Sequence, residues 1–192
     1  MADEAIQARK WTRFEYDRLV ECEILGSGER LELLAGDMVV KEPQHSPHAT
    51  GIQLAAEALR LAFGPAFHVR VQAPVALDAD SEPEPDVCVV AGAPRDYRDA
   101  HPVRPVLIAE VALSRLAFDR DRKGSLYARA AIGEYWIVNL LDRRLEVYRD
   151  PAPDAAAQFG WRYGGVQSLA PGARIAPLAA PSALVPVADL LP

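Results

Sequence analysis

Apolar side chains recur at helical spacing in three parts of the chain, and this pattern predicts three helices. The predicted helices lie within residues 11–22, 46–65 and 118–131. The second is the clearest, because its apolar residues form one stripe along the helix, made by Ile52, Ala55, Leu59 and Phe63.

The residues that flank these stretches indicate where each helix begins and ends. Thr12 is the expected N-cap of the first helix. Ser46 is the expected N-cap of the second helix, with Pro47 at its first helical position. The Gly64-Pro65 pair is expected to end the second helix, and Gly133 the third.

The segments between the helices have strand-like patterns. Two of them, residues 29–43 and 134–150, predict β-hairpins, with Gly36 in the first turn and Asp142-Arg143 near the second. Residues 67–78 alternate like a strand, residues 96–105 form a loop, and the apolar runs 86–92 and 106–113 are expected to be central strands. The chain is therefore predicted to have an α/β (α+β) fold, with a mixed sheet flanked by helices and added hairpins.

The length of 192 residues suits one domain, and a hydrophobic content of 50% provides for a sizeable core. Residues 1–10 are polar and are expected to be a flexible N-terminus. Residues 11–151 are expected to form the main domain. Residues 152–192 are rich in Ala and Pro and predict an extension with short edge strands, packed on the same domain.

Charge and cysteine content bear on location and partners. Cys22 and Cys88 have no metal-site spacing, which favours a reducing compartment. No signal peptide is visible at the N-terminus, and no run reaches the roughly 18 apolar residues of a membrane span. We therefore expect a cytoplasmic protein without a membrane partner. The net charge of −6 argues against a strongly basic nucleic-acid-binding protein, but not against a local basic surface.

Two carboxylates stand in the predicted central strands. Asp86 opens the first strand, in "EPEPDVCVV", and Glu110 lies within the second, on the same face as Ile108 and Ala112. A carboxylate at such a position loses its hydration, which costs several kcal/mol unless a positive group meets it. Lys123, on the following predicted helix, is one candidate for that group.

Each of these residues also has a simpler interpretation. Asp86 could begin a strand after a proline, as Asp often does. Glu110 could pair with an arginine of "DRDRK". Lys123 could be a solvated helix residue paired with Asp119. The three together, in this order and setting, favour an active site.

The chemistry that two such acids and a lysine can perform is hydrolysis of a phosphodiester. Carboxylate oxygens of Asp86 and Glu110 would hold Mg²⁺ or Mn²⁺ with some of its waters retained. The metal would polarise the phosphoryl oxygen and acidify a bound water. Lys123 would position that water and neutralise charge that develops on phosphorus.

The chain from Trp11 to about Pro151 resembles a prokaryotic family of restriction endonuclease-like proteins. The resemblance lies in "RLELLAGDMVV", "SPHA", "EPEPDVCVV", "IAEVALSRLAFDRDRKGSLYARAAIGEYWIVN" and "LEVYRDP", over roughly three quarters of the chain. It implies that residues 11–151 form a PD-(D/E)xK nuclease core, in which Pro85-Asp86, Glu110 and Lys123 supply the motif. Ala112 stands at the usual position of the lysine, which in this family lies on the following helix.

The resemblance also indicates supporting residues. Glu32 matches an acidic position that could contact a metal through water, and His48 matches a histidine near the start of the long helix. Tyr127 follows Lys123 by four residues and is a third candidate. In "EVALSR", however, Ala112 and Leu113 replace small polar or acidic residues of the family.

The expected function is therefore that of an Mg²⁺-dependent endonuclease acting on DNA. Residues 95–129 carry eight Lys and Arg against five acids, and Arg115, Arg120 and Arg122 are candidates for a nucleic-acid-binding rim. A homodimer would suit cleavage of two strands. One alternative, which "EVALSR" favours, is a non-catalytic module that binds nucleic acid or a protein. Another is a hydrolase of small phosphate esters.

Overall fold

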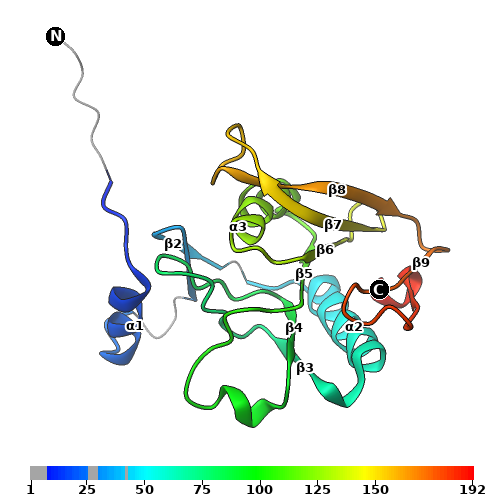
Figure 1. Ribbon diagram of the computed structural model, residues 1–192, viewed down its shortest axis with the longest axis horizontal. Helices are drawn as coiled ribbons and strands as arrows, with labels where there is room; N and C mark the ends of the chain where they lie inside the picture. Colours follow the sequence, from blue (N-terminus) through cyan, green and yellow to red (C-terminus); the bar gives the residue numbers. More distant parts are fainter. Residues whose placement is uncertain (1–7, 26–29, 42) are drawn as a thin grey trace.

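A six-stranded mixed sheet forms the centre of the computed structural model, which describes residues 8–25, 30–41 and 43–192 (Figure 1). Its strands lie in chain order: β3 (Phe67–Val71), β4 (Val87–Ala91), β5 (Leu107–Ala112), β6 (Glu134–Asn139), β7 (Arg144–Pro153) and β8 (Trp161–Leu169). The strands β5 and β6 are parallel, and the other neighbours are antiparallel. The predicted α/β (α+β) class with a mixed sheet is confirmed, and both apolar strands are internal.

Three α-helices accompany the sheet: α1 (Arg13–Glu21), α2 (Ser46–Phe63) and α3 (Gly124–Arg129). A π-helical segment, Phe118–Lys123, leads directly into α3, and together they make the crossover between β5 and β6. Single 3₁₀ turns lie at Gly64–Ala66, Pro94–Tyr97 and Val187–Leu190. Within the described ranges, none of the helices combines the length and apolar character that a membrane crossing requires.

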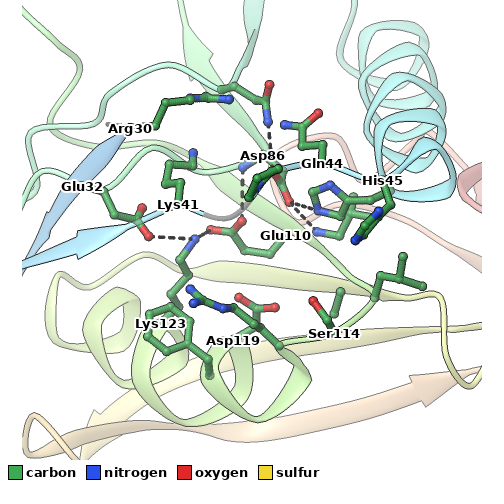
Figure 2. Close-up of a pocket in the computed structure, with 18 residues that line it drawn as sticks. Arg30, Glu32, Lys41, Gln44, His45, Asp86, Glu110, Ser114, Asp119 and Lys123 are labelled. Atoms are coloured by element: carbon green, nitrogen blue, oxygen red, sulfur yellow. Dashed lines mark hydrogen bonds and ion pairs between the residues drawn. The ribbon is translucent and has the colours of Figure 1, made fainter. Parts of the chain in front are cut away.

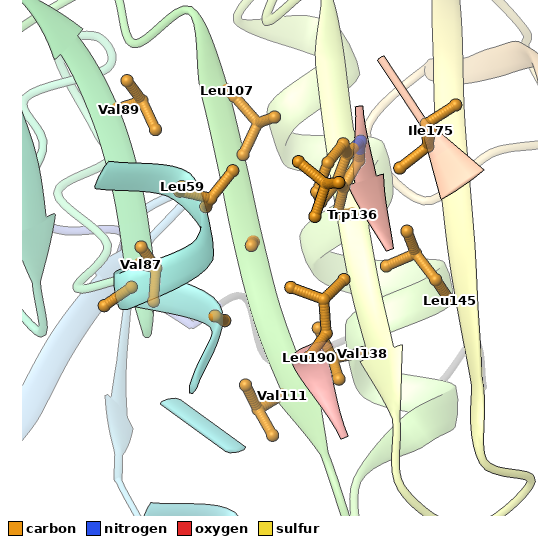
Figure 3. Close-up of a cluster of buried hydrophobic side chains, with 14 of the residues drawn as sticks. Leu59, Val87, Val89, Leu107, Val111, Trp136, Val138, Leu145, Ile175 and Leu190 are labelled. Carbon is orange, nitrogen blue, oxygen red and sulfur yellow. The ribbon is translucent and has the colours of Figure 1, made fainter. Parts of the chain in front are cut away.

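The alternation of side chains along the strands divides the core between the two faces of the sheet. On one face, Val87, Leu107 and Trp136 pack against α2, where Leu59 is fully buried (Figure 3). On the other face, Cys88, Ile108 and Tyr135 pack against Tyr127 and Ala128 of α3. Each central strand thus buries both faces, which is why its sequence is apolar throughout.

The first hairpin forms a separate two-stranded sheet of β1 (Leu31–Leu34) and β2 (Asp37–Val40). Ala35 and Gly36 take positive φ values of 50° and 78° in its turn, as a two-residue hairpin loop requires. A Cβ at Gly36 would also lie 2.7 Å from the Cβ of Lys10. A backbone bridge between Leu33 and Glu82 attaches the hairpin to the loop that precedes β4.

The C-terminal residues complete the core on the α2 face. The short strands β9 (Arg174–Ile175) and β10 (Val185–Pro186) pair with each other, and Ile175, Val185 and Leu190 join the cluster around Leu59. The predicted short edge strands are present in this pair. The edge strand β8, however, has nine residues, and β7 continues past Pro151 to pair with it.

Two predicted helix starts differ in outcome. Thr12 is the N-cap of α1, as predicted, and its hydroxyl accepts a hydrogen bond from the Glu15 N–H at 3.2 Å. The prediction of Ser46 as N-cap of α2 is wrong, because the helix begins at Ser46 and His45 occupies the cap. Pro47 is consequently the second helical residue, where its missing N–H costs the helix no hydrogen bond. The predicted end at Gly64 is confirmed.

Two other boundaries were predicted too far along the chain. The strand predicted for residues 67–78 ends at Val71, because Gln72 takes a φ of 48° and its N–H turns to the Asp86 carbonyl at 3.1 Å. The third helix ends at Arg129, and Ala131 rather than Gly133 takes the positive φ, at 57°. In both cases a non-glycine residue adopts the left-handed conformation, which residue type does not indicate.

Glu134 is the polar anchor of the C-terminal segment. Its carboxylate is fully buried and accepts hydrogen bonds from the Trp136 indole at 3.0 Å, from Arg149 Nε at 3.0 Å and from the Leu178 N–H at 2.7 Å. The hydrogen bond from Leu178 thus connects the segment after β8 to strand β6, which begins at Glu134.

Glu134→Ala is expected to lower the free energy of unfolding by about 3 kcal/mol, because it leaves a charged and two neutral donors unpaired inside the protein. Urea unfolding monitored by Trp fluorescence measures this loss. Glu57→Ala, at an exposed position of α2, is the control and should change stability by less than about 0.5 kcal/mol. Equal effects of the two substitutions would contradict the anchoring role of Glu134.

Candidate active site

A pocket with a cavity of about 100 Å³ lies at the edge of the sheet where β4 begins and β5 ends (Figure 2). The hairpin β1–β2, the start of α2 and the π-helical segment form its other walls. Gly51 lets α2 approach β5 closely, since a Cβ there would lie 2.9 Å from Val111 Cγ1. All three residues of the predicted motif, Asp86, Glu110 and Lys123, line this pocket.

Strand register brings the two acids together. The strands β4 and β5 are antiparallel with Val87 opposite Ala109, so Asp86 lies next to Glu110. The Asp86 N–H donates to Glu110 Oε2 at 3.2 Å, and the Val111 N–H donates to Asp86 Oδ2 at 2.9 Å. Two hydrogen bonds thus join Asp86 to Glu110 and Val111, although the two acids lie 24 positions apart in the sequence.

Asp86 also contacts two side chains from the opposite wall. His48 Nε2 of α2 lies 3.3 Å from Asp86 Oδ2, and Gln72 Nε2 lies 3.5 Å from Oδ1. Burial raises the pKa of Asp86, but the hydrogen bond from His48 and the charge of Lys123 outweigh burial, so the pKa is lowered. Asp86 is thus held as a carboxylate.

Glu110 receives its positive partner from the crossover. Lys123 Nζ donates to Glu110 Oε1 at 2.8 Å, and the Tyr127 hydroxyl donates to the same oxygen at 2.7 Å. Lys123 also lies 3.6 Å from Glu32 Oε1 on β1. The partner of Glu110 is therefore Lys123 and not an arginine, and Lys123, only 5% exposed, is not a solvated helix residue.

The π-helical backbone places charged side chains inside the protein. The Gly124 N–H donates to the Asp119 carbonyl, five residues earlier, and the Tyr135 hydroxyl donates to the same carbonyl at 3.1 Å. Both Asp119 and Lys123 of this segment are buried and line the pocket. Single π-helical turns within helices are frequent at functional sites. The sequence predicted an ordinary α-helix here and did not reveal this turn.

Four carboxylates surround one ammonium group in the pocket: Glu32, Asp86, Glu110 and Asp119 face Lys123. Burial lowers the pKa of Lys123, but the charges of Glu110 and Glu32 raise it well above its ordinary value, so the amine stays protonated. Burial raises the pKa of Glu110, which Lys123 opposes. Around Lys123 itself the acids outnumber the cations, whereas Arg30, Lys41 and Arg115 line the pocket farther along its walls.

The donor set fits Mg²⁺ or Mn²⁺ bound mainly through water and substrate. Over residues 8–25, 30–41 and 43–192, no group of three or more His, Cys, Asp or Glu side chains is placed to hold a metal. Mg²⁺ usually binds through one or two carboxylates while it keeps several waters. Asp86 and Glu110 supply two hard oxygen donors of that kind on adjacent strands.

The three predicted supporting residues are all close to these acids. Glu32 lies near Lys123, and its Oε2 accepts the Glu84 N–H at 3.1 Å. His48 contacts Asp86, and Tyr127 contacts Glu110, as described above. Their roles stay predictions, but the structure brings them to one place.

The three arginines of the predicted basic rim have different surroundings. Arg115 lines the pocket, whereas Arg120 and Arg122 do not. Arg120 Nε binds Glu146 at 2.9 Å, and Arg122 binds Asp37 at 2.7 Å. Their part in a nucleic-acid-binding rim stays a prediction, and the helix directs both side chains to carboxylates on β7 and β2.

Other pocket residues had no signal in the sequence. Arg30 and Lys41, at the ends of the first hairpin, lie on the rim together with Gln44 and His45. Lys41 Nζ donates to the Glu84 carbonyl at 2.7 Å and lies 3.3 Å from the Glu84 carboxylate. Only the attachment of the hairpin to the loop before β4 brings these cations near Asp86.

Comparison with known proteins adds an independent line of evidence. The family model of Uma2, described as "putative restriction endonuclease", matches residues 14–179. The chain belongs to the Uma2 family. The match extends from α1 beyond β9 and includes every described residue that lines the pocket. The resemblance drawn from the sequence is confirmed.

A solved structure shows the same fold. It is the crystal structure of a putative nuclease belonging to DUF820 from Anabaena variabilis ATCC 29413, and the TM-score is 0.68. The identity is 16%, and the likeness covers 90% of this chain and 96% of that chain. The restriction endonuclease-like fold is thereby confirmed, and with membership of the Uma2 family it supports a nuclease-like function. No curated protein matches the chain.

The three acids of "EPEPD" have three different surroundings. Asp86 lies in the pocket. Glu84 forms ion pairs with Lys41 and Arg30, which also line the pocket, and Arg30 Nη2 lies 3.5 Å from Glu84 Oε2. Glu82 is buried elsewhere, with Arg13 at 3.9 Å, and its Oε2 accepts no hydrogen bond from any described residue. Burial raises the pKa of Glu82 to about 7.

Lys123→Met is expected to lower the free energy of unfolding by about 3–5 kcal/mol, because it leaves Glu110 buried without its partner. In a Glu110→Gln background the same substitution should cost clearly less, since the charge is gone. Urea unfolding of the four proteins measures the difference. Lys10→Met, which removes the exposed pair with Asp37, is the matched control and should cost at most about 1 kcal/mol.

Glu82 is expected to make the protein less stable as pH rises. The native carboxyl retains its proton up to a pKa of about 7, whereas the unfolded carboxyl loses it near the ordinary glutamate pKa of 4.5. The free energy of unfolding should therefore fall between these pH values. Glu82→Gln removes the titrating carboxyl. The free energy of unfolding of the variant, relative to that of wild type, should therefore rise by about 1–3 kcal/mol between pH 4 and pH 8. Urea unfolding across this range measures the gain, and a difference independent of pH would contradict it.

Proposed function

We propose that this member of the Uma2 family is a metal-dependent endonuclease that hydrolyses phosphodiester bonds in DNA. One observation carries the proposal: Asp86, Glu110 and Lys123 are buried, converge on one pocket and interact directly, with Lys123 Nζ 2.8 Å from Glu110. Strongly perturbed ionisable groups that converge in a pocket are typical of active sites.

Asp86 and Glu110 would hold the Mg²⁺ or Mn²⁺ ion of this proposal. Bound there, the ion would supply Lewis acidity toward a phosphoryl oxygen and lower the pKa of a water. The Val111 N–H and His48 fix the orientation of Asp86, and Tyr127 fixes that of Glu110. These contacts hold both carboxylates in place before a ligand arrives, which lowers the cost of binding.

Lys123 would orient the attacking water and stabilise negative charge on the phosphoryl oxygens. Its ammonium stays protonated between Glu110 and Glu32, so it acts as a hydrogen-bond donor rather than as a base. A fixed donor in a site shielded from water stabilises developing charge more than a donor in solvent does.

The rim supports a polyanionic substrate. Arg30, Lys41 and Arg115 line the pocket on two different walls, and Glu84 pairs with the first two. Such cations can contact phosphates on either side of the one being cleaved. A small phosphate ester would reach fewer of these groups, which favours a nucleic acid, and DNA is our specific proposal. A homodimer stays a prediction.

The wild-type protein is expected to nick supercoiled plasmid at low salt with Mg²⁺ or Mn²⁺, and chelator should abolish the reaction. Asp86→Asn should reduce the rate by at least about 100-fold, because it removes one of the two anionic metal ligands. Gel electrophoresis of a time course measures both rates.

Asp121→Asn is the matched control, because Asp121 is exposed and does not line the pocket. Its nicking rate should equal that of wild type. Nicking that survives Asp86→Asn would contradict the assigned site. Plasmid binding without cleavage by any preparation would instead indicate a non-catalytic nucleic-acid-binding module.

A further inference from the structure

Asp119 differs from the other acids of the pocket because its carboxylate makes no hydrogen bond with any described residue, although the charge of Lys123 acts on it. Its side chain lines the pocket and is buried, at 7% exposure. Glu32, Asp86 and Glu110 each accept at least one hydrogen bond. For the part of the chain that the structure describes, the Asp119 carboxylate has neither a hydrogen bond nor an ion pair. An unpaired buried carboxyl lowers stability, so structural stability does not explain its position.

The backbone holds Asp119 firmly in this unfavourable position. Its carbonyl accepts the Tyr135 hydroxyl at 3.1 Å and the Gly124 N–H of the π-helical turn. Figure 2 shows the side chain on the helical wall, between Lys123 and Ser114, with Asp86 on the opposite side of the pocket. A phosphate between these walls would have Asp86 and Glu110 on one side and Asp119 on the other.

The surroundings of Asp119 favour its protonated form. Burial raises its pKa to about 8, the charge of Lys123 opposes this, and the carboxylates of Glu110, Asp86 and Glu32 raise it further. The environment therefore favours the protonated carboxyl over the carboxylate. A divalent cation on Asp86 and Glu110 would lower this pKa. Dependence of the cleavage rate on the leaving group therefore tests the role of Asp119 better than dependence on pH does.

We propose that Asp119 is the general acid that protonates the leaving oxygen of the phosphodiester. This role rests on the proposed nuclease function. A water oxygen forms a bond to phosphorus as the bond from phosphorus to the leaving oxygen breaks. The carboxyl O–H of Asp119 gives its proton to that oxygen, which departs as an alcohol. The attacking water releases one proton to solvent, and Asp119 regains one from solvent through the mouth of the pocket.

A pair of substrates that differ in one atom tests this role. One is an oligonucleotide with an ordinary phosphodiester, and the other has sulfur in place of the leaving oxygen. A thiolate departs without a proton, so its release needs no general acid. Both are cleaved in single-turnover assays with Mn²⁺, by wild type, Asp119→Asn and Asp121→Asn. Asp121 lies two residues away, is exposed and undergoes the same chemical change.

Asp119→Asn is expected to slow cleavage of the oxygen substrate by about 10²- to 10⁴-fold, the usual contribution of a general acid. It should slow cleavage of the sulfur substrate less than about 3-fold, because only the proton transfer is lost. Asp121→Asn should leave both rates unchanged. The Tm of Asp119→Asn should be equal to or above that of wild type, since the substitution removes an unpaired buried acid.

Four outcomes would overturn the role of Asp119. Equal slowing of both substrates would show that the side chain shapes the site or binds metal, and full activity on both would show that it is dispensable. A lower Tm together with equal slowing would assign it to folding. Failure of wild type to cleave either substrate would refute the nuclease function itself, and with it this role.

Discussion

The structure depends on the ion pair between Lys123 and Glu110, which is buried between the sheet and its crossover helix. A charge on a central strand is tolerated only when an opposite charge and hydrogen bonds meet it, and Lys123 and Tyr127 provide both. The pair joins β5 to the helix that follows it, and Glu32 extends it to the first hairpin. The same contact therefore contributes both to the packing of the sheet and to the wall of the pocket.

The topology explains why these groups meet at this edge. Antiparallel pairing puts the first residue before β4 beside the end of β5, and this places Asp86 next to Glu110. The parallel pairing of β5 and β6 requires a crossover, and its helix covers the face to which Glu110 points. The π-helical turn in this crossover then places Asp119 and Lys123 in one pocket. Each step follows from backbone pairing rather than from contacts among the acids themselves.

Most elements of the fold were predictable because their signals are local. Periodicity identified the helices around α1, α2 and α3 and the central strands, and Gly36 identified the first turn. The errors occur where a distant group decides a boundary. Gln72 leaves the strand pattern to bond the Asp86 carbonyl, and Ala131 adopts a conformation that its residue type disfavours. No local pattern contains that information.

The sequence by itself determined the sheet-and-helix fold, the family and the three residues of the motif, since a charge in an apolar strand and an ordered set of motif residues are visible in one dimension. Only the tertiary structure decided which cations reach the site. Arg120 and Arg122 look as suitable as any arginine in the sequence, but helix direction pairs them with Glu146 and Asp37. Lys41 gave no signal, and Asp119 was considered only as a helix partner of Lys123, because burial and distance arise only when separate segments pack together.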